Sequence, residues 1–286
     1  MGVSVITPSL LRAQTLRCLD HLPKLSPMMT RLLAQLARPN CEIQDLVKTA
    51  ECDPMLSGQI LGLANSATFG RQQAVSSVRH AVAMIGTNAM RKFALGSSIS
   101  NLFSRTKLAK SFSIRRFNVH SVATATLLEL LSEELPFESG DDAFVAGLLH
   151  DVGKLVIAVN LPRQYDDILA LTAVNGSTLI EAERDVIGID HAELSSLALA
   201  RWELSEAIQL AARDHHQPGE STGKPGLSLG VHHADAYINH LGISVLTSPL
   251  PCQKAATLEI PGFTFSQERV LQRFEQERQT LGDLFR

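Results

Sequence analysis

Apolar residues recur along the chain at intervals of three and four, which is the spacing of one face of an α-helix. Two of these segments begin with a pair that typically starts a helix, Ser26-Pro27 and Asp53-Pro54. The apolar face of the first consists of Met29, Leu32, Leu33 and Leu36, and that of the second of Leu56, Ile60, Leu61 and Ala64. Because strand-like alternation and hairpin turn dipeptides are missing from the first hundred residues, this part predicts four or five short helices.

The second half of the chain continues this helical pattern. A long helix is expected from about Ser113 to Leu135, because helices usually end before a proline and Pro136 follows. The acidic pair Asp141-Asp142 predicts the start of one further helix over residues 144–159. Other helix starts are indicated at Thr178 with Glu181, at Asp190 with Glu193 and at Ser205, and a helix is expected over residues 227–240. The whole pattern predicts an all-α fold.

Composition supports this class and narrows the function. The 286 residues are 45% hydrophobic and 19% charged, which is enough apolar material for a core and argues against disorder. Leu and Ala recur throughout, and both lose little rotamer freedom in a helix. The net charge of −3 gives no global basic field of the kind that nucleic-acid binding favours.

Membrane insertion and secretion are not expected. The longest stretch near the C-terminus without Lys, Arg, Asp or Glu, residues 236–253, contains Asn239, His240, Pro249 and Pro251, so it predicts no spanning helix. A secretory signal is not recognisable at the N-terminus. The four cysteines, at positions 18, 41, 52 and 252, have no CxxC spacing and are interpreted as free thiols. This usage predicts a reducing, cytoplasmic location.

The segment His150-Asp151-Val152-Gly153-Lys154 is the main candidate for chemistry. Imidazole nitrogen and carboxylate oxygen are both good ligands for divalent first-row metals, so His150 and Asp151 can bind one ion over a helix edge. Lys154 lies on the same side of the helix, where its ammonium group could meet a phosphate oxygen. Gly153 leaves room for the backbone there.

Further possible ligands lie on other predicted helices, and helix bundles usually assemble a metal site in this way. They are His120 in the middle of the long helix, His191 in a first turn, His215 and His216 at a helix end, and Asp235 in the helix over residues 227–240.

Ordinary structural roles remain open for the same residues. A His-Asp pair is often solvated or a capped core histidine, and a His-His pair at a helix C-terminus is explained by the helix dipole. Asp190 is better explained as an N-cap than as a ligand, and His232, His233 and His240 are expected at the surface. A Gly-rich phosphate loop and a nucleophile elbow are both missing from the sequence.

Several spaced motifs together resemble the HDOD proteins, the output-domain branch of the HD metal-dependent phosphohydrolase superfamily. In the second half they are FVAGLLHDVGKLVI (144–157), GIDHAELSSLALARWELSEAI (188–208) and HHQP (215–218). In the first half they are LPKLSP (22–27), CDP (52–54), LANSA (63–67) and AVAMIG (81–86). The resemblance covers about residues 20–240 and implies a multi-helix bundle of the HDOD and HD-domain type.

This resemblance also implies how the chain is organised. It divides the sequence into an N-terminal extension (1–20), the N-terminal helical half of the HDOD domain (21–110), an HD-like helical half (111–242) and a C-terminal helical tail (243–286).

The resemblance further implies a ligand set. The superfamily binds one or two metals, and the matching positions for the first are His120, His150, Asp151 and Asp235. The HD-GYP relatives, which hydrolyse cyclic di-GMP, add a histidine and a His-His pair, and His191, His215 and His216 occupy the same order here. Two departures argue against that particular activity. Arg116 replaces an acidic ligand, and Gln217-Pro218-Gly219 follows the His-His pair without Glu or Gly-Tyr-Pro.

Two functions therefore compete. The first is a bacterial-type signal-transduction protein that acts through contacts with a regulatory protein partner, with a divalent metal (Fe, Mn, Zn, Ni or Mg) bound at the His/Asp site. The alternative is a metal-dependent phosphohydrolase, either a phosphodiesterase or a nucleotide phosphatase, with Asp151 and Lys154 as catalytic residues. A third idea, nucleic-acid binding, is supported only by the basic residues Arg105, Lys107, Lys110, Arg115 and Arg116. Such runs are usually a solvated face, so nucleic acid is not expected as a partner.

Overall fold

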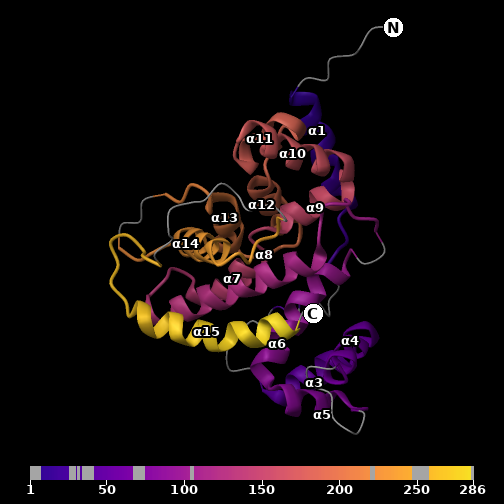
Figure 1. Ribbon diagram of the computed structural model, residues 1–286, viewed down its shortest axis with the longest axis vertical. Coiled ribbons are helices and arrows are strands. Elements are labelled where there is room, and N and C mark those ends of the chain that lie inside the picture. Colours follow the sequence, from indigo (N-terminus) through magenta and orange to yellow (C-terminus); the bar gives the residue numbers. More distant parts are fainter. Residues whose placement is uncertain are drawn as a thin grey trace.

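A computed structural model describes residues 8–25, 30, 33, 42–66, 75–103, 106–219, 223–246 and 258–284 (Figure 1). These residues form helices and no strand, so the predicted all-α fold is confirmed. The helix expected after Ser26-Pro27 lies largely outside the described residues, although Leu33 of its predicted apolar face is buried. Among the described helices none is long and apolar enough to cross a membrane alone, and one bent pair (Gly140–Asn160 with Pro162–Val174) passes only on length and composition.

The described elements follow one another in chain order. They are α1 (Pro8–Arg17), η1 (Cys18–His21), α3 (Ile43–Glu51), α4 (Pro54–Ala64), α5 (Val78–Ile85), α6 (Thr87–Asn101), α7 (Ile114–Glu134), η2 (Gly140–Asp142), α8 (Ala143–Leu149), α9 (Val152–Asn160), α10 (Pro162–Asn175), α11 (Leu179–Ile187), α12 (His191–Arg201), α13 (Glu206–Asp214), α14 (Leu227–His240) and α15 (Gln267–Leu284). Here η marks a short 3-10 helix.

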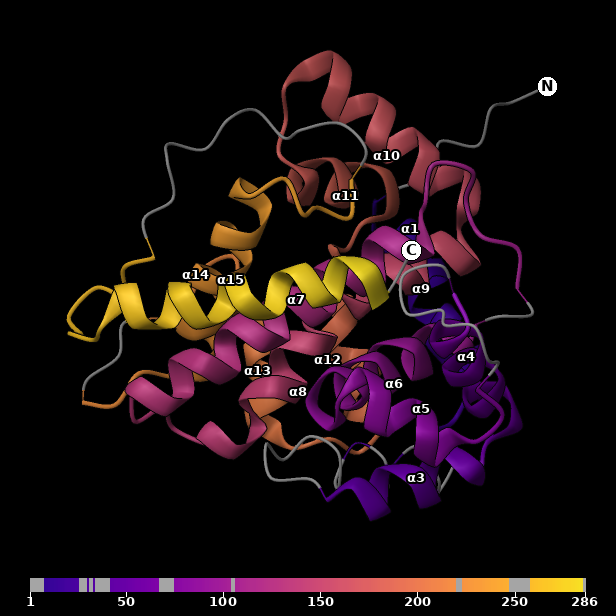
Figure 2. The same cartoon turned by 60° about the horizontal axis from the view of Figure 1, so that its bottom comes forward.

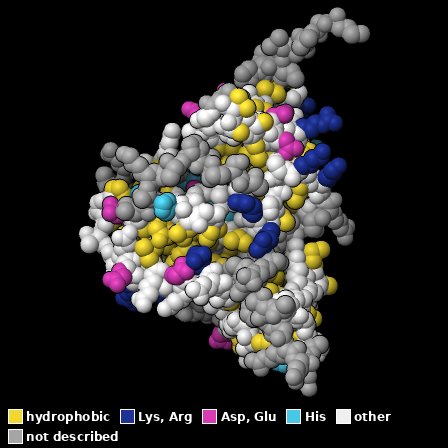
Figure 3. Space-filling view, viewed as in Figure 1, with side chains coloured by type: hydrophobic (Ala, Val, Ile, Leu, Met, Phe, Trp, Pro, Cys, Tyr) yellow, Lys and Arg dark blue, Asp and Glu magenta, His cyan; other side chains and the backbone are white. Residues whose placement is uncertain are grey.

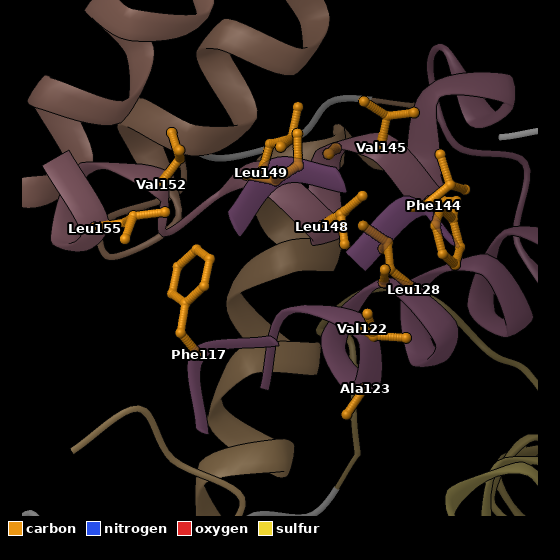
Figure 4. Close-up of a cluster of buried hydrophobic side chains, with 14 of the residues drawn as sticks. Phe117, Val122, Ala123, Leu128, Phe144, Val145, Leu148, Leu149, Val152 and Leu155 are labelled. Carbon is orange, nitrogen blue, oxygen red and sulfur yellow. The ribbon is translucent and has the colours of Figure 1, made fainter. Parts of the chain in front are cut away.

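The long helix α7 runs through the middle of the molecule and organises the packing around it (Figure 1). It packs against α8 and α14 on one side and against α6 and α15 on the other. As the sequence predicts, it starts at the Ser113 cap, which accepts a hydrogen bond from the backbone N–H of Arg116, and ends before Pro136. Its apolar residues lie in one buried cluster with those of α8 and α9, where Leu128 lies near Phe144 and Phe117 lies near Leu155 (Figure 4).

The first helices form a group at one end of the molecule, where α3, α4 and α5 lie beside α6 (Figure 2). The Asp53 carboxylate caps α4 by accepting the N–H groups of Met55 and Leu56, as the Asp-Pro pair predicts. Helix α6 is almost wholly buried because it lies between this group and α7. By contrast, α1 packs against α11, far along the chain.

A buried ionic network joins α6, α7 and the C-terminal helix α15. Arg91 of α6 donates to both carboxylate oxygens of Glu129 on α7 at 2.9 Å, and Lys92 lies 3.5 Å from the same carboxylate. Lys92 also donates to Glu277 of α15. Because both cations are almost completely buried, losing either carboxylate would leave an uncompensated charge in the core.

The structure differs from the sequence prediction at the His-Asp doublet. The helix expected over residues 144–159 is interrupted, and His150 and Asp151 lie between α8 and α9. The N–H of Gly153 donates to the hydroxyl of Ser195 at 2.8 Å, so a side chain from α12 takes a donor that a continuous helix would bond internally. Gly153 permits this approach, since a Cβ there would lie 2.1 Å from the carbonyl oxygen of His191.

Gly147 is expected to be essential for the contact between α7 and α8. A Cβ at this position would lie 2.6 Å from Cα of Ala125, so Gly147→Ala must push two backbones apart. We expect this substitution to lower the free energy of unfolding by at least ~2 kcal/mol in denaturant titrations. The matched control is Gly58→Ala on α4, where nothing lies within 4 Å and removing a helical glycine should stabilise by ~0.5–1 kcal/mol. Equal effects of the two substitutions would contradict this packing.

Candidate functional site

The structure brings all seven predicted ligand residues into one buried cluster. Helix α7 contributes His120, the break between α8 and α9 contributes His150 and Asp151, α12 begins with His191, His215 and His216 follow α13, and α14 contributes Asp235. Their ligand atoms form two groups, and within each group all atoms lie within 4.8 Å of one another. The first group is His120, His150, Asp151 and Asp235, and the second is His191, His215 and His216.

Asp151 connects the two groups. Its Oδ2 lies 3.4 Å from Nε2 of both His120 and His150. Its other oxygen, Oδ1, lies 3.3 Å from Nε2 of His191 and 3.8 Å from Nε2 of His215. Asp235 lies across the first group, with Oδ1 3.0 Å from Nε2 of His120. One carboxylate therefore faces both groups at once.

The outer ring nitrogen of the histidines is fixed by the surrounding fold. Nδ1 lies 2.8 Å from the carbonyl oxygen of Ile243 in His120, of Gly147 in His150 and of Ala212 in His215. Because a carbonyl oxygen can only accept, each Nδ1 carries the hydrogen and Nε2 is turned into the cluster. Among the described residues, Nε2 of these three histidines and Oδ1 of Asp151 are buried and have no hydrogen-bond partner. Four inward-facing polar atoms without partners are what a metal site requires.

His191 is held by Glu183, a residue that the sequence analysis missed. Oε2 of Glu183 lies 2.7 Å from both the backbone nitrogen and Nδ1 of His191, and the carboxylate is buried. Burial raises the pKa of Glu183 to about 8. A signal for it does exist in the sequence, since Glu183 lies four residues from both Leu179 and Ile187 on the buried face of α11.

Lys154 has a partner that the sequence did not predict. Its Nζ donates to Oδ2 of Asp151 at 2.6 Å and the side chain is buried, so in this structure the ammonium group neutralises Asp151. Asp190 is confirmed as the N-cap of α12, since its side chain accepts from the N–H of Glu193. His232 and His233 are half-buried instead of exposed, and Nδ1 of His232 lies 2.6 Å from the carbonyl oxygen of His215, whereas His240 is exposed as expected.

Arg116, which departs from the HD-GYP pattern, also acts on the cluster from outside. Its Nε donates to the carbonyl oxygen of Ser244 at 3.0 Å. The neighbouring carbonyl, that of Ile243, accepts the Nδ1–H of His120 one turn further along α7. Arg116 and His120 therefore hold the same short segment after α14.

The histidines of the two ligand groups differ in charge. Burial opposes the positive charge of His150, but Asp151 and Asp235 outweigh it and raise the pKa of His150 to about 10. The pKa of His120 is raised for the same reasons. Burial also opposes ionisation of Asp151, yet His150 and Lys154 beside it hold the pKa of Asp151 well below its usual range. In the second group burial lowers the pKa of His191 and of His215, so both are neutral.

Together, the helical bundle and the buried cluster around a His-Asp doublet define an HD-type helical domain. The family model of the HDOD domain matches residues 22–218, so the chain belongs to the HDOD family. The resemblance seen in the sequence motifs is thereby confirmed.

Solved structures with the same fold support this assignment. An HDOD domain protein of unknown function from Geobacter sulfurreducens is 22% identical, with a TM-score of 0.70 and coverage of 96% of this chain and 97% of that chain. A candidate phosphohydrolase from Shewanella amazonensis SB2B is 20% identical, with a TM-score of 0.68 and the same coverage of 96% and 97%. A candidate signal transduction protein from Marinobacter aquaeolei VT8 is 18% identical, with a TM-score of 0.69, covering 100% of this chain and 68% of that chain. At these identities the likeness shows the fold.

A curated relative is an uncharacterised protein from Treponema pallidum (strain Nichols). It is 22% identical over 205 residues, which are 69% of this chain. The match spans 38% of the length of that relative.

Divalent metal ions are expected to bind this cluster more tightly as the pH rises. With a pKa of about 10, His150 carries a proton at neutral pH that a metal must displace from Nε2, and the raised pKa of His120 adds a second. Each proton released should change the affinity by ~10-fold per pH unit. Calorimetric titrations with Mn²⁺ at about pH 6.5 and about pH 8.5 measure this. An affinity that does not change between these conditions would contradict the proton occupancy.

Proposed function

We propose that this HDOD protein holds divalent metal at the His/Asp cluster and works as a signal-transduction module that contacts a regulatory protein partner. The observation that carries the metal part is the set of unpartnered inward atoms, Nε2 of three histidines and Oδ1 of Asp151. Their outer nitrogens are fixed by carbonyl oxygens in the arrangement that metal-binding histidines have. The residues present therefore fit a metal ion.

The chemistry of the ligands favours a first-row transition metal. Five of the seven side chains are imidazoles and two are carboxylates. Imidazole suits Fe, Ni and Zn, whereas Mn²⁺ and Mg²⁺ prefer oxygen ligands and Mg²⁺ also retains several waters. We therefore place Mg²⁺ last among the metals expected from the sequence.

The regulatory role is supported by the closed form of the cluster and by the rest of the fold. Six of its residues are buried, with His216 the more exposed member at the edge, and Figure 3 shows histidine side chains at only a few points on the face it displays. Metal bound there would cross-link segments from α7 to α14, so occupancy would change how firmly they pack. Among the described residues, α3 to α6 add no ligand to the cluster. The exposed sides of α3, α4 and α5 are available as a contact surface.

A phosphohydrolase is the second candidate, and one observation favours it. Asp151 faces both ligand groups, and two neighbouring metals that share a carboxylate are common in enzymes that cleave phosphate esters. When bound, such metals supply Lewis acidity toward a phosphoryl oxygen. The chain itself would orient Asp151 through Lys154 and His191 through Glu183.

Asp151→Ala is expected to remove bound metal. The substitution deletes the carboxylate shared by both groups, so the metal content of protein purified without chelators should fall to below about a tenth of the wild-type level. Elemental analysis by mass spectrometry measures it. The matched control is Asp214→Ala, because Asp214 is next to His215 but pairs with Arg213 outside the cluster. Equal metal content in both variants, or none in the wild type, would overturn the metal site.

The two candidate functions give opposite results in one pair of assays. The regulatory function predicts that metal-loaded protein captures a specific partner, that Asp151→Ala releases it, and that bis(p-nitrophenyl) phosphate and cyclic dinucleotides are not hydrolysed. Turnover that needs metal and is lost in Asp151→Ala, without a captured partner, would establish the phosphohydrolase instead.

A further inference from the structure

A second site is present between α4, α6 and the start of α7, apart from the His/Asp cluster. It is a cavity of about 280 Å³ at the junction of the first helices with the HD half. Its polar wall comes from Gln59, Ser97, Ser100, Asn101 and Asn118, and its apolar wall includes Phe103. The cavity lies near the ~300 Å³ at which small-molecule pockets begin, so it fits a small ligand or one part of a larger one.

The amide side chains in this wall have hydrogen-bonding capacity to spare. Gln59 and Asn101 donate to each other's carbonyl oxygen, both at 3.0 Å, which leaves each with one N–H and one lone pair. Nδ2 of Asn118 donates to the Ser100 hydroxyl at 3.1 Å, but Oδ1 of Asn118 is buried without a hydrogen-bond partner. Asn118 is only 8% exposed, so water does not compensate this oxygen freely. The cavity therefore offers a buried acceptor that a ligand donor would satisfy.

The combination of amides and apolar side chains matches a nucleobase. None of the lining residues that the structure describes is charged, which favours a neutral group inside. An amide can present a donor and an acceptor to the polar edge of a purine, and Asn118, with its unpartnered Oδ1, is the amide of this wall that can accept from one. Phe103 and Leu108 supply apolar contacts for the faces of a flat ring.

Two exposed cations are next in sequence to residues of the cavity wall. Lys107 directly follows the lining residue Thr106, Arg115 directly follows the lining residue Ile114, and both cations are exposed. Ile114 is also the first residue of the 21-residue helix α7, whose N-terminal end favours an anion. A base held inside would place an attached phosphate toward these cations. Two residues of the basic run that suggested nucleic-acid binding would thus contact the phosphate of a much smaller molecule.

We propose that the cavity formed by Gln59, Asn101 and Asn118 binds a purine nucleoside monophosphate, with the base among the amides and the phosphate near Lys107 and Arg115. This site does not depend on metal at Asp151. Asn118 is two residues before His120 on α7, so the bound nucleotide would contact the same helix that contributes His120 to the His/Asp cluster.

Calorimetric titration of the full chain with AMP and GMP tests the proposal, with adenosine, guanosine and ribose 5-phosphate as comparisons. At least one monophosphate should bind, its nucleoside more weakly, and ribose 5-phosphate not measurably. Asn118→Leu and Gln59→Leu should each weaken binding by at least ~10-fold, and Lys107→Gln should weaken the nucleotide but not the nucleoside. Gln272→Leu, at an exposed amide on α15, is the matched control and should change nothing.

The same titrations include the outcomes that would contradict the nucleotide site. The proposal is overturned if neither monophosphate binds, if ribose 5-phosphate binds as tightly as the nucleotide, or if Gln59→Leu and Asn118→Leu both bind like the wild type. Gln59 is only partly buried, so its variant provides a test even if Asn118→Leu fails to fold. Asp151→Ala should keep nucleotide binding whether or not the metal site is real. Loss of binding in that variant would assign the nucleotide to the His/Asp cluster instead.

Discussion

The negative charge of Asp151 is the constraint on which the site depends. The side chain is 0% exposed, and an isolated carboxylate at such a place would cost several kcal/mol. The fold compensates it at Oδ2, with the Lys154 ammonium and the first His group, whereas the neutral imidazoles of the second group face Oδ1 and add no positive charge. A shared proton can satisfy some of these contacts, but Oδ1 remains without a hydrogen bond. A divalent cation beside Asp151 would satisfy Oδ1 and the inward-facing Nε2 atoms at once.

The arrangement of the helices follows from bringing these groups to one carboxylate. The break after Leu149 releases His150 and Asp151 from helical geometry, where adjacent side chains point about 100° apart. Gly147 and Gly153 let α8 and α9 approach their neighbours closely enough for the imidazoles to meet. The outer shell then comes from carbonyl oxygens and Glu183, so most of the precision of the site depends on backbone positions.

Local sequence signals predicted the helices, whereas the features that depend on tertiary contacts could not be predicted from them. The limits of α7 followed from Ser113 and Pro136, and α14 spans residues 227–240 as expected, because caps and prolines act on their own neighbours. The seven clustered residues were candidates because of their ligand chemistry, and the resemblance to a family grouped them into one ligand set. The helix break was missed because its cause, the Ser195 hydroxyl, lies 42 residues from Gly153 in sequence. The bond from Lys154 to Asp151 was missed for a similar reason, since the burial that selects this partner is not visible in the sequence.

Anomalous X-ray scattering from crystals of the metal-loaded protein tests the central claim most directly. A metal site at Asp151 predicts at least one peak at about 2.0–2.2 Å from an oxygen of Asp151 and from inward-facing Nε2 atoms. Nδ1 of the same histidines should keep its hydrogen bond to the carbonyl oxygen. It would be contradicted by a crystal that has been given transition metal and shows no peak beside Asp151, with the carboxylate held by Lys154 and protonated histidines alone.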